Sequence, residues 1–307
     1  MSQVGDTSAA DFASGSVDDG AFVARTDRAE VLLRAAEAAE FAGPDLPPGW
    51  FARPWADGGR VYFADGGLAI DGALVGSRTL ISGGRSIEFA ATFAERPDQH
   101  VGFGVDYVHP PWCMFSTKWG RRLYARTHFT VVEDKKLAGS WLGSPHRYVI
   151  DWRFLYVDFS VDGARAAHLL VPMPPAMRPL AGNARLGGVP LVLHWARMSP
   201  YRPAGCFTSR VLDPGAAVAW TEASWAADEP DGTSVVLEWR SGDRPAPDRT
   251  WSAWARLRAG VTLGRTSRYA QYRAALTTTD TATTPVLRAV SLGYRSGDRS
   301  SGSAGSD

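Results

Sequence analysis

The chain has little of what marks several functional classes. Two cysteines in 307 residues, Cys113 and Cys206, form neither a disulfide framework nor a metal cluster, so free thiols in a reducing compartment are expected. No run of about 18 apolar residues occurs, so no transmembrane helix is predicted. The net charge is +1, and no cluster of lysine and arginine is present. These absences argue against nucleic acids and membranes as partners.

The first twenty residues are polar and acidic and lack the apolar segment of a secretory signal. With Met1 as the native start, this indicates a cytoplasmic protein. A chain from which a signal had been removed would look the same.

Metal and cofactor motifs are also missing. The six histidines, at 100, 109, 128, 146, 168 and 194, show no HxH or HxxxH spacing. No glycine-rich phosphate loop links a strand to a helix, and no GxSxG elbow occurs. The sequence therefore predicts no metal and no cofactor, although a structural calcium held by backbone oxygens would leave no sequence mark.

The residues present indicate an all-β protein with two domains. Residues 1–25 are expected to be disordered. AEVLLRAAEAAEFA predicts a helix at about 27–41, with Asp27 as its N-cap and Glu30 three residues on. Strands with alternating apolar residues follow and complete a first domain, 26–202.

Near residue 203 the strand series restarts. CFTSRVLD, SVVLEWRSG, RYAQYRAAL and PVLRAVSLGY predict a smaller β-sandwich over residues 203–295. The glycine- and serine-rich residues 296–307 are expected to be a disordered tail.

Between His100 and Gly163 the segments VGFGVDY, PWCMFST, RLYARTHFTV, PHRYVIDW and YVDFSVDG follow one another as short strands. This order resembles the concanavalin A-like lectin/glucanase superfamily, which includes the family 16 glycoside hydrolases. The resemblance implies a two-sheet jelly-roll sandwich. The second strand series resembles the smaller β-sandwich module that follows such domains in actinobacterial proteins.

The resemblance also implies a strand carrying catalytic carboxylates, and the corresponding segment here has none. Its best counterpart is 112–117, where Trp112, Met114 and Ser116 are predicted on one face and Cys113, Phe115 and Thr117 on the other. A retaining glycosidase needs two carboxyl groups about 5 Å apart. Retaining glycoside hydrolysis is therefore not expected.

The next strand offers a different set of polar groups. Tyr124, Arg126 and His128 are predicted in line on the open face, where they supply a hydroxyl, a fixed cation and an imidazole. Asp106 is the acid predicted near this row, where it could orient His128 or act as a base. The row can be catalytic, or it can belong to the scaffold.

Six further residues are candidate ligand contacts. Trp119 and Arg121 lie in KWGRR, where an aromatic ring could stack on a ligand or simply pack over a loop. His194 stands where the resembling sequences usually have aspartate, and it is either a recruited base or a hydrogen-bonded structural residue. The full predicted ligand set is Trp112, Met114, Ser116, Trp119, Arg121 and His194.

Two functions remain open from the sequence, of which we prefer the first. One is a cofactor-free acid–base enzyme of cyclase, dehydratase or isomerase type that acts on a polyhydroxylated small metabolite, such as a polyketide undergoing ring closure. The other is a non-catalytic, lectin-like protein that binds a glycan. The absent signal segment favours the enzyme, and the absent carboxylates favour the lectin.

Overall fold

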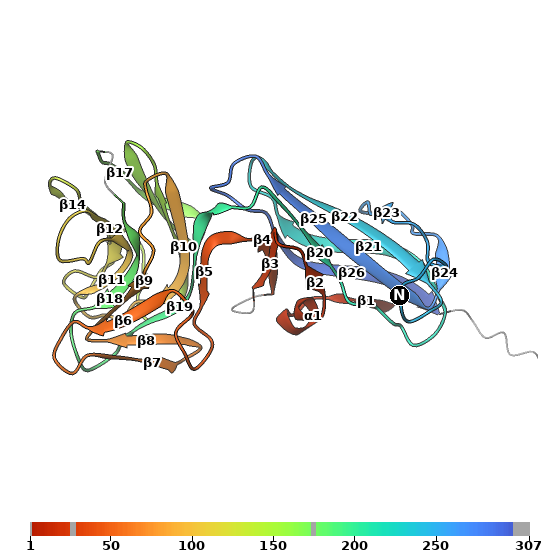
Figure 1. The fold of residues 1–307 in the computed structure, drawn as a ribbon, viewed down its shortest axis with the longest axis horizontal. Helices are drawn as coiled ribbons and strands as arrows, with labels where there is room; N and C mark the ends of the chain where they lie inside the picture. The colour runs from red at the N-terminus through yellow and green to blue at the C-terminus, as the bar shows by residue number, and fades with distance from the viewer. Residues whose placement is uncertain (1, 25–28, 173–175, 297–307) are drawn as a thin grey trace, which may run out of the picture. The chain divides into compact units, whose positions relative to one another are not determined.

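The computed structural model describes residues 2–24, 29–172 and 176–296, which form antiparallel β-sheets almost throughout (Figure 1). The chain divides into two compact units. The sandwich unit is Ala35–Pro200, and the split unit joins the residues up to Arg34 to those from Tyr201 onward. The predicted all-β fold is confirmed.

One sheet of the sandwich unit has seven strands in the order β14-β13-β12-β11-β18-β9-β6. All neighbours pair antiparallel. The strands are β6 (Trp50–Pro54), β9 (Ala73–Ser77), β11 (Gln99–Gly104), β12 (Trp112–Ser116), β13 (Tyr124–His128), β14 (Val132–Lys136) and β18 (Arg178–Asn183).

The second sheet of this unit has eight strands in the order β17-β16-β15-β10-β19-β8-β7, with β5 paired to β19. Its strands are β5 (Ala35–Glu40), β7 (Arg60–Ala64), β8 (Gly67–Asp71), β10 (Arg85–Thr92), β15 (His146–Trp152), β16 (Tyr156–Val161), β17 (Ala164–Leu170) and β19 (Leu191–Tyr201).

A large apolar core joins the two sheets of the sandwich unit. Alternate residues of each strand point into it, because successive side chains of a strand face opposite ways. Phe115 lies in its middle, with ring centroids 4.9 Å from Tyr148 and 5.2 Å from Phe159. This is the two-sheet architecture that the resemblance to concanavalin A-like proteins implied.

The split unit is built from two further sheets, one of six strands in the order β24-β21-β26-β4-β3 with β1 on β26, and one of five in the order β2-β20-β25-β22-β23. The first holds β1 (Ser2–Asp6), β3 (Ala21–Ala24), β4 (Glu30–Leu33), β21 (Val218–Asp228), β24 (Arg265–Ser267) and β26 (Val286–Ser296). The second holds β2 (Ser16–Val17), β20 (Ala204–Thr208), β22 (Thr233–Gly242), β23 (Ala255–Arg256) and β25 (Tyr269–Thr278).

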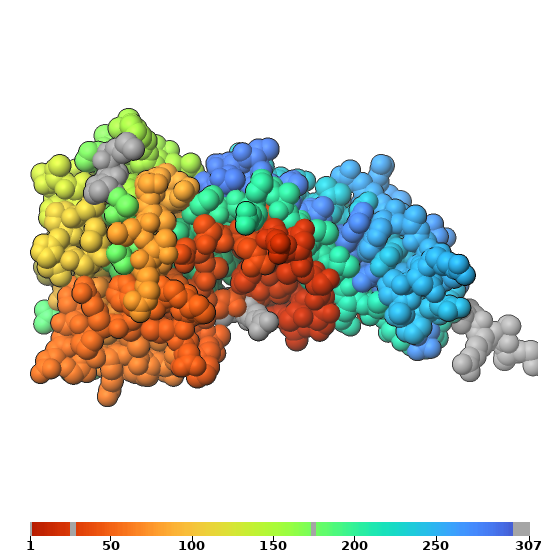
Figure 2. All heavy atoms as spheres, in the orientation of Figure 1, coloured from red at the N-terminus to blue at the C-terminus, as the bar shows by residue number. Residues whose placement is uncertain are grey.

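The N-terminal residues are part of the split unit, so the expected disorder of residues 1–25 is wrong for the described stretch 2–24. Strand β1 pairs with β26, and β2 pairs with β20, far along the chain. In the space-filling view these residues lie directly against the later part of the unit (Figure 2). The expected tail lies, from residue 297 on, outside the described residues.

The helix expected at about 27–41 is also wrong, because Glu30–Leu33 and Ala35–Glu40 are strands. Pairing with β3, β26 and β19 outweighs the helix propensity of this alanine-rich segment. Residues 25–28, with the predicted cap Asp27, lie outside the described residues. Among the described residues the one helix is α1 (Ala9–Ala13), capped by Ser8.

The boundary between the two units also differs from the predicted one. The expected first domain, 26–202, gives way to a unit that begins at Ala35 and ends at Pro200. Cys113 is buried in the sandwich unit and Cys206 lies in the split unit, and both are free thiols.

Candidate functional site

The candidate site is the outer face of the seven-stranded sheet, the side away from the main core. On β12, Cys113 and Phe115 enter the main core, so Trp112, Met114 and Ser116 point outward, as the alternation predicts. Trp112 and Met114 join a separate apolar cluster on this face. Its members are Leu74, Tyr107, Trp112, Met114 and Leu180, with Phe51 and Trp55 packed against them.

Trp55 reaches this cluster because β18 has a glycine beneath it. A Cβ at Gly182 would lie 2.5 Å from the Trp55 ring. Gly182→Val is therefore expected to displace the indole and to cost about 1–3 kcal/mol of stability by overpacking. Near-ultraviolet circular dichroism and denaturant unfolding measure both effects. An unchanged tryptophan signal would contradict this packing.

The polar row lies on β13, beside the cluster. Tyr124, Arg126 and His128 are half-buried and alternate with the buried Ala125 and Thr127. The row therefore faces outward, and pairing with β12 sets it beside Trp112, Met114 and Ser116. The two predicted sets of residues share one face.

Asp134 on β14 joins this row and was not anticipated. Its carboxylate accepts a hydrogen bond from Arg126 Nε at 2.5 Å and another from Lys118 Nζ. Partial burial alone would raise the pKa of Asp134, but the hydrogen bonds from these two cations hold that pKa below its ordinary value. Asp134 is therefore an ionised anchor for Arg126 rather than a proton donor.

Aromatic contacts order the rest of the row. The Arg126 guanidinium lies 5.2 Å from the centre of the Trp112 ring, a cation–π contact. The His128 ring meets the same indole edge-on at 5.3 Å. Trp112 thus supports two members of the row from the neighbouring strand.

His100 on β11 is a second residue of this face that was not predicted from the sequence. It is 8% exposed, its Nδ1 lies 2.9 Å from Ser116 Oγ, and its ring lies 5.9 Å from both Trp55 and Tyr107. Burial, helped by the charge of Arg126, lowers the pKa of His100 to about 3. The imidazole is therefore neutral near pH 7. Val101 and Phe103 face the main core, so the same alternation could have identified His100.

Trp119 is the most exposed tryptophan of this region. Its side chain is 70% exposed, beside Lys118, whose Nζ lies 3.8 Å from the ring centre. The indole also meets Tyr124 edge-on at 5.9 Å. It is therefore supported from one side and open to solvent, as a stacking surface requires. Arg121 is exposed in the same turn.

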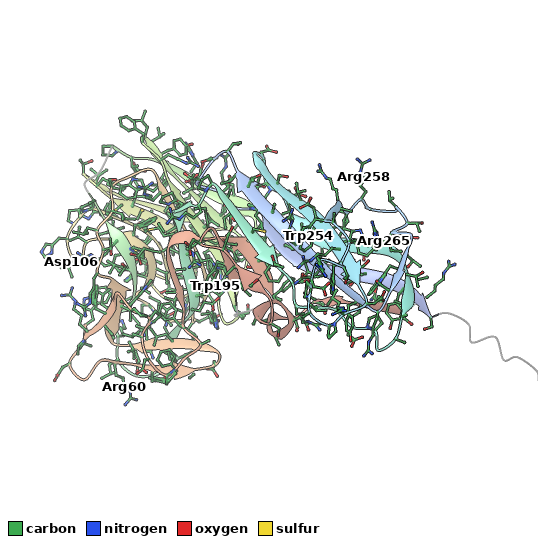
Figure 3. All side chains as sticks on the ribbon, turned by 45° about the vertical axis from the view of Figure 1, so that its right-hand side comes forward. Arg60, Asp106, Trp195, Trp254, Arg258 and Arg265 are labelled. Carbon is green, nitrogen blue, oxygen red and sulfur yellow. The ribbon has the colours of Figure 1, made fainter. Side chains whose placement is uncertain are left out.

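Asp106 does not join the row. Strand β11 ends at Gly104, and the Asp106 carboxylate accepts hydrogen bonds from the backbone N–H groups of Val108 and His109 and contacts His109 Nδ1 at 3.0 Å. Figure 3 shows Asp106 at the periphery of the sandwich unit. Tyr107 packs in the outer apolar cluster instead of the main core, so the alternation that placed Asp106 beside His128 breaks in this turn.

His194 lies on the other sheet of the sandwich unit, on β19. Its Nδ1 is 3.3 Å from the Gly66 carbonyl, and its Nε2 is 3.0 Å from Thr92 Oγ1. A carbonyl can only accept, so Nδ1 donates to Gly66 and the Thr92 hydroxyl donates to Nε2. Both ring nitrogens are occupied, and His194 is separate from the row.

Within residues 2–24, 29–172 and 176–296, no group of three or more His, Cys, Asp or Glu side chains could hold a metal ion. No helix in these ranges is long and apolar enough to cross a membrane. Asp134 is the carboxylate that contacts the row, and two cations already bind it. Among the described residues, this face therefore offers an aromatic ring for stacking and groups for hydrogen bonding, and the carboxylate at the row is already paired with Arg126 and Lys118.

Comparisons with known proteins give matches to solved structures alone. No family model matches the chain, and no curated protein matches it. The β-glucanase of Bacillus licheniformis is 14% identical over 53% of this chain and 97% of its own, with a TM-score of 0.40. A Crh5 transglycosylase in complex with NAG is 14% identical over 58% of this chain and 88% of its own, with a TM-score of 0.42.

A third solved structure is an immunostimulatory antigen and pseudo β-1,3-glucanase of Mycobacterium tuberculosis. The two chains are 15% identical over 53% of the present chain and 98% of the antigen, with a TM-score of 0.40. Each of these likenesses spans about half of the present chain.

Proposed function

We propose that the outer face of the seven-stranded sheet binds a carbohydrate or a similarly hydroxylated small molecule. The observation that carries the proposal is the pairing of the exposed Trp119 ring with the row of Tyr124, Arg126 and His128. Sugar rings combine apolar C–H faces with hydroxyl edges. An aromatic ring beside fixed donors and acceptors suits both surfaces at once.

Arg126 is held in place before any ligand arrives. Asp134 accepts a hydrogen bond from its Nε, and its guanidinium lies 5.2 Å from the centre of the Trp112 ring. Among the described residues, the hydrogen bond of this side chain is made by Nε, so its other N–H groups can donate to a ligand. A preorganised donor loses little side-chain entropy on binding, which favours affinity for hydroxyl oxygens.

Trp119→Ala tests the stacking role. We expect about a tenfold or larger loss of affinity for the bound oligosaccharide, because stacking on one exposed ring contributes on the order of 1.5 kcal/mol. Isothermal titration calorimetry with neutral oligosaccharides selected on a glycan array measures it. Phe154→Ala is the matched control, since Phe154 is 63% exposed and belongs to another part of the sandwich unit. Equal losses in both variants would contradict the proposal.

A second candidate is acid–base catalysis on such a ligand, as in a cyclase, dehydratase or isomerase acting on a polyhydroxylated metabolite. The row of Tyr124, Arg126 and His128 favours it, because it sets a hydroxyl, a cation and an imidazole on one face. The contacts of Asp106 weaken it, because this carboxylate binds the backbone of its own turn and His109 instead of orienting His128. His128→Ala separates the two functions. A lost turnover with retained affinity supports catalysis, and an unchanged metabolite profile in the mutant strain supports binding alone.

A further inference from the structure

At one end of the eight-stranded sheet, two hydrogen bonds link the side chains of a serine, a histidine and an aspartate in that order. Ser144 Oγ is 3.0 Å from His146 Nε2, and His146 Nδ1 is 2.8 Å from Asp162 Oδ2. Each ring nitrogen thus contacts the partner that a serine nucleophile requires, with the hydroxyl on Nε2 and the carboxylate on Nδ1.

The local fold explains why the three residues meet. His146 begins β15, which pairs with β16, and Asp162 follows β16 directly. Asp162 and Gly163 have φ angles of 49° and 83°, so they form the two-residue turn that joins β16 to β17. This turn brings the Asp162 carboxylate to the start of β15.

Asp162 is fixed and ionised. Its Oδ1 accepts a hydrogen bond from the Arg147 N–H at 2.9 Å, and its own N–H donates to the Arg147 carbonyl at 2.8 Å. Burial acts to raise the pKa of Asp162, but the hydrogen bonds from Arg147 and His146 keep it below the ordinary value. A charged carboxylate on Nδ1 keeps the proton there and leaves Nε2 free to accept from Ser144.

The His146 imidazole is largely buried, whereas Ser144 is exposed to solvent. The His146 side chain is 17% exposed, and Trp141 meets its ring edge-on at 5.2 Å. The Trp141 indole is itself anchored to the Ala138 carbonyl at 2.6 Å. Ser144 is exposed, so a substrate reaches the nucleophile without a rearrangement of the base.

Comparison with other histidines shows that this arrangement is unusual within the described part of the chain. Within the described part of the chain, His109 and His168 also pair with aspartates, at 3.0 Å and 2.8 Å. In neither case does a serine hydroxyl contact the other ring nitrogen. His100 contacts Ser116 but has no aspartate. Among the residues that the structure describes, the His146–Asp162 pair is the histidine–aspartate pair that continues to a serine.

We propose that Ser144, His146 and Asp162 form a hydrolytic triad that cleaves small acyl esters, an activity separate from the ligand binding proposed above. Ser144 Oγ attacks the ester carbonyl and its proton passes to His146 Nε2. The bond from the carbonyl carbon to the alcohol oxygen then breaks, and His146 returns the proton to the departing alcohol. Water attacks the acyl-serine with His146 as base, which releases the carboxylic acid and restores Ser144.

The surroundings indicate the size of the acyl group. Ser144 sits on an open loop, and the apolar side chains next to it, Trp141 and Leu142, are partly buried against the main core. Because they are partly exposed, they offer an acyl chain a small apolar surface beside Ser144, which suits a short chain. Acetyl and similarly short esters of an alcohol are therefore the substrate class that the site accepts.

Covalent labelling of the full chain with a fluorophosphonate tests the triad. The reagent phosphonylates an activated serine and releases fluoride. Digestion and mass spectrometry are expected to place the label on Ser144, and Ser144→Ala removes it. His146→Gln is expected to slow labelling at least about a hundredfold, the usual contribution of a general base. The same ranking is expected for hydrolysis of p-nitrophenyl acetate.

His168→Gln is the matched control, because it breaks a histidine–aspartate pair that has no serine. Its labelling rate should stay within about twofold of the unmodified chain, since His168 is outside the triad and a general base alone contributes about a hundredfold or more. Ser144 is exposed, so the folding of Ser144→Ala, checked by circular dichroism, is not at issue. No label on the folded chain, or equal rates with His146→Gln and His168→Gln, would overturn the proposal.

Discussion

The free energy of unfolding of the sandwich unit is expected to be about 2 kcal/mol lower at pH 5 than at pH 7, because His100 stays neutral in the folded state. Its pKa falls from 6.5 to about 3 on folding, through burial and then through the charge of Arg126. Between these two values the unfolded chain binds the extra proton and the folded chain does not. Stability therefore falls as the pH falls from about 6.5 towards 3, by about 1.4 kcal/mol per pH unit.

Denaturant unfolding of the sandwich unit at pH 7, 6 and 5 measures this slope. His100→Asn keeps a polar partner for Ser116 and cannot titrate, so it should lose most of the difference between pH 7 and pH 5. His168→Gln removes an exposed histidine and should retain it. If His100→Asn keeps the full slope, the imidazole is not buried beside Ser116 as described.

Asp6→Ala is expected to destabilise the split unit by about 3 kcal/mol, because it removes a hydrogen bond from the charged Arg210 and leaves a buried hydroxyl without its acceptor. Asp6 is fully buried on β1, where it accepts hydrogen bonds from Arg210 Nε at 2.9 Å and from the Tyr272 hydroxyl at 2.7 Å. Its removal leaves the Tyr272 hydroxyl without that acceptor inside the unit. Thermal or denaturant unfolding of the split unit measures the loss.

Asp11→Ala is the comparison for this prediction. Asp11 also contacts Arg210, at 3.0 Å, but its side chain is 29% exposed. Its loss removes a surface ion pair and part of a helix cap, which together cost about 1 kcal/mol. Equal effects of the two substitutions would mean that β1 does not bury Asp6 in the split unit.

Alternation along the strands predicted most of the sandwich. It put Cys113 and Phe115 on the face opposite Trp112, and the Tyr124 row on the open face, because burial on one side of a sheet imposes a period of two. The helix at 27–41 failed for the opposite reason. There, pairing with distant strands decides the structure, and local propensity carries no information about such partners.

The candidate site was predictable only within single strands. Asp106 was misplaced because a turn after Gly104 ends the alternation. His194 matches its structural alternative and not the ligand contact, because sequence order does not say which sheet a strand joins. Asp134 was missed because its role depends on pairing between β13 and β14. The contact of Ser144, His146 and Asp162 likewise depends on a hairpin register that the sequence does not specify.

Ligand binding on the outer face is tested most directly by the indole N–H signals of the labelled full chain in a nuclear magnetic resonance titration. The probe is a panel of neutral oligosaccharides of glucose, galactose, mannose and N-acetylglucosamine, with the tryptophan signals assigned by single Trp→Phe variants. We expect saturable shifts at Trp119, Trp112 and Trp55, with the signals of Trp251 and Trp254 of the split unit unchanged. Shifts confined to the split unit, or no shift with any oligosaccharide, would contradict it.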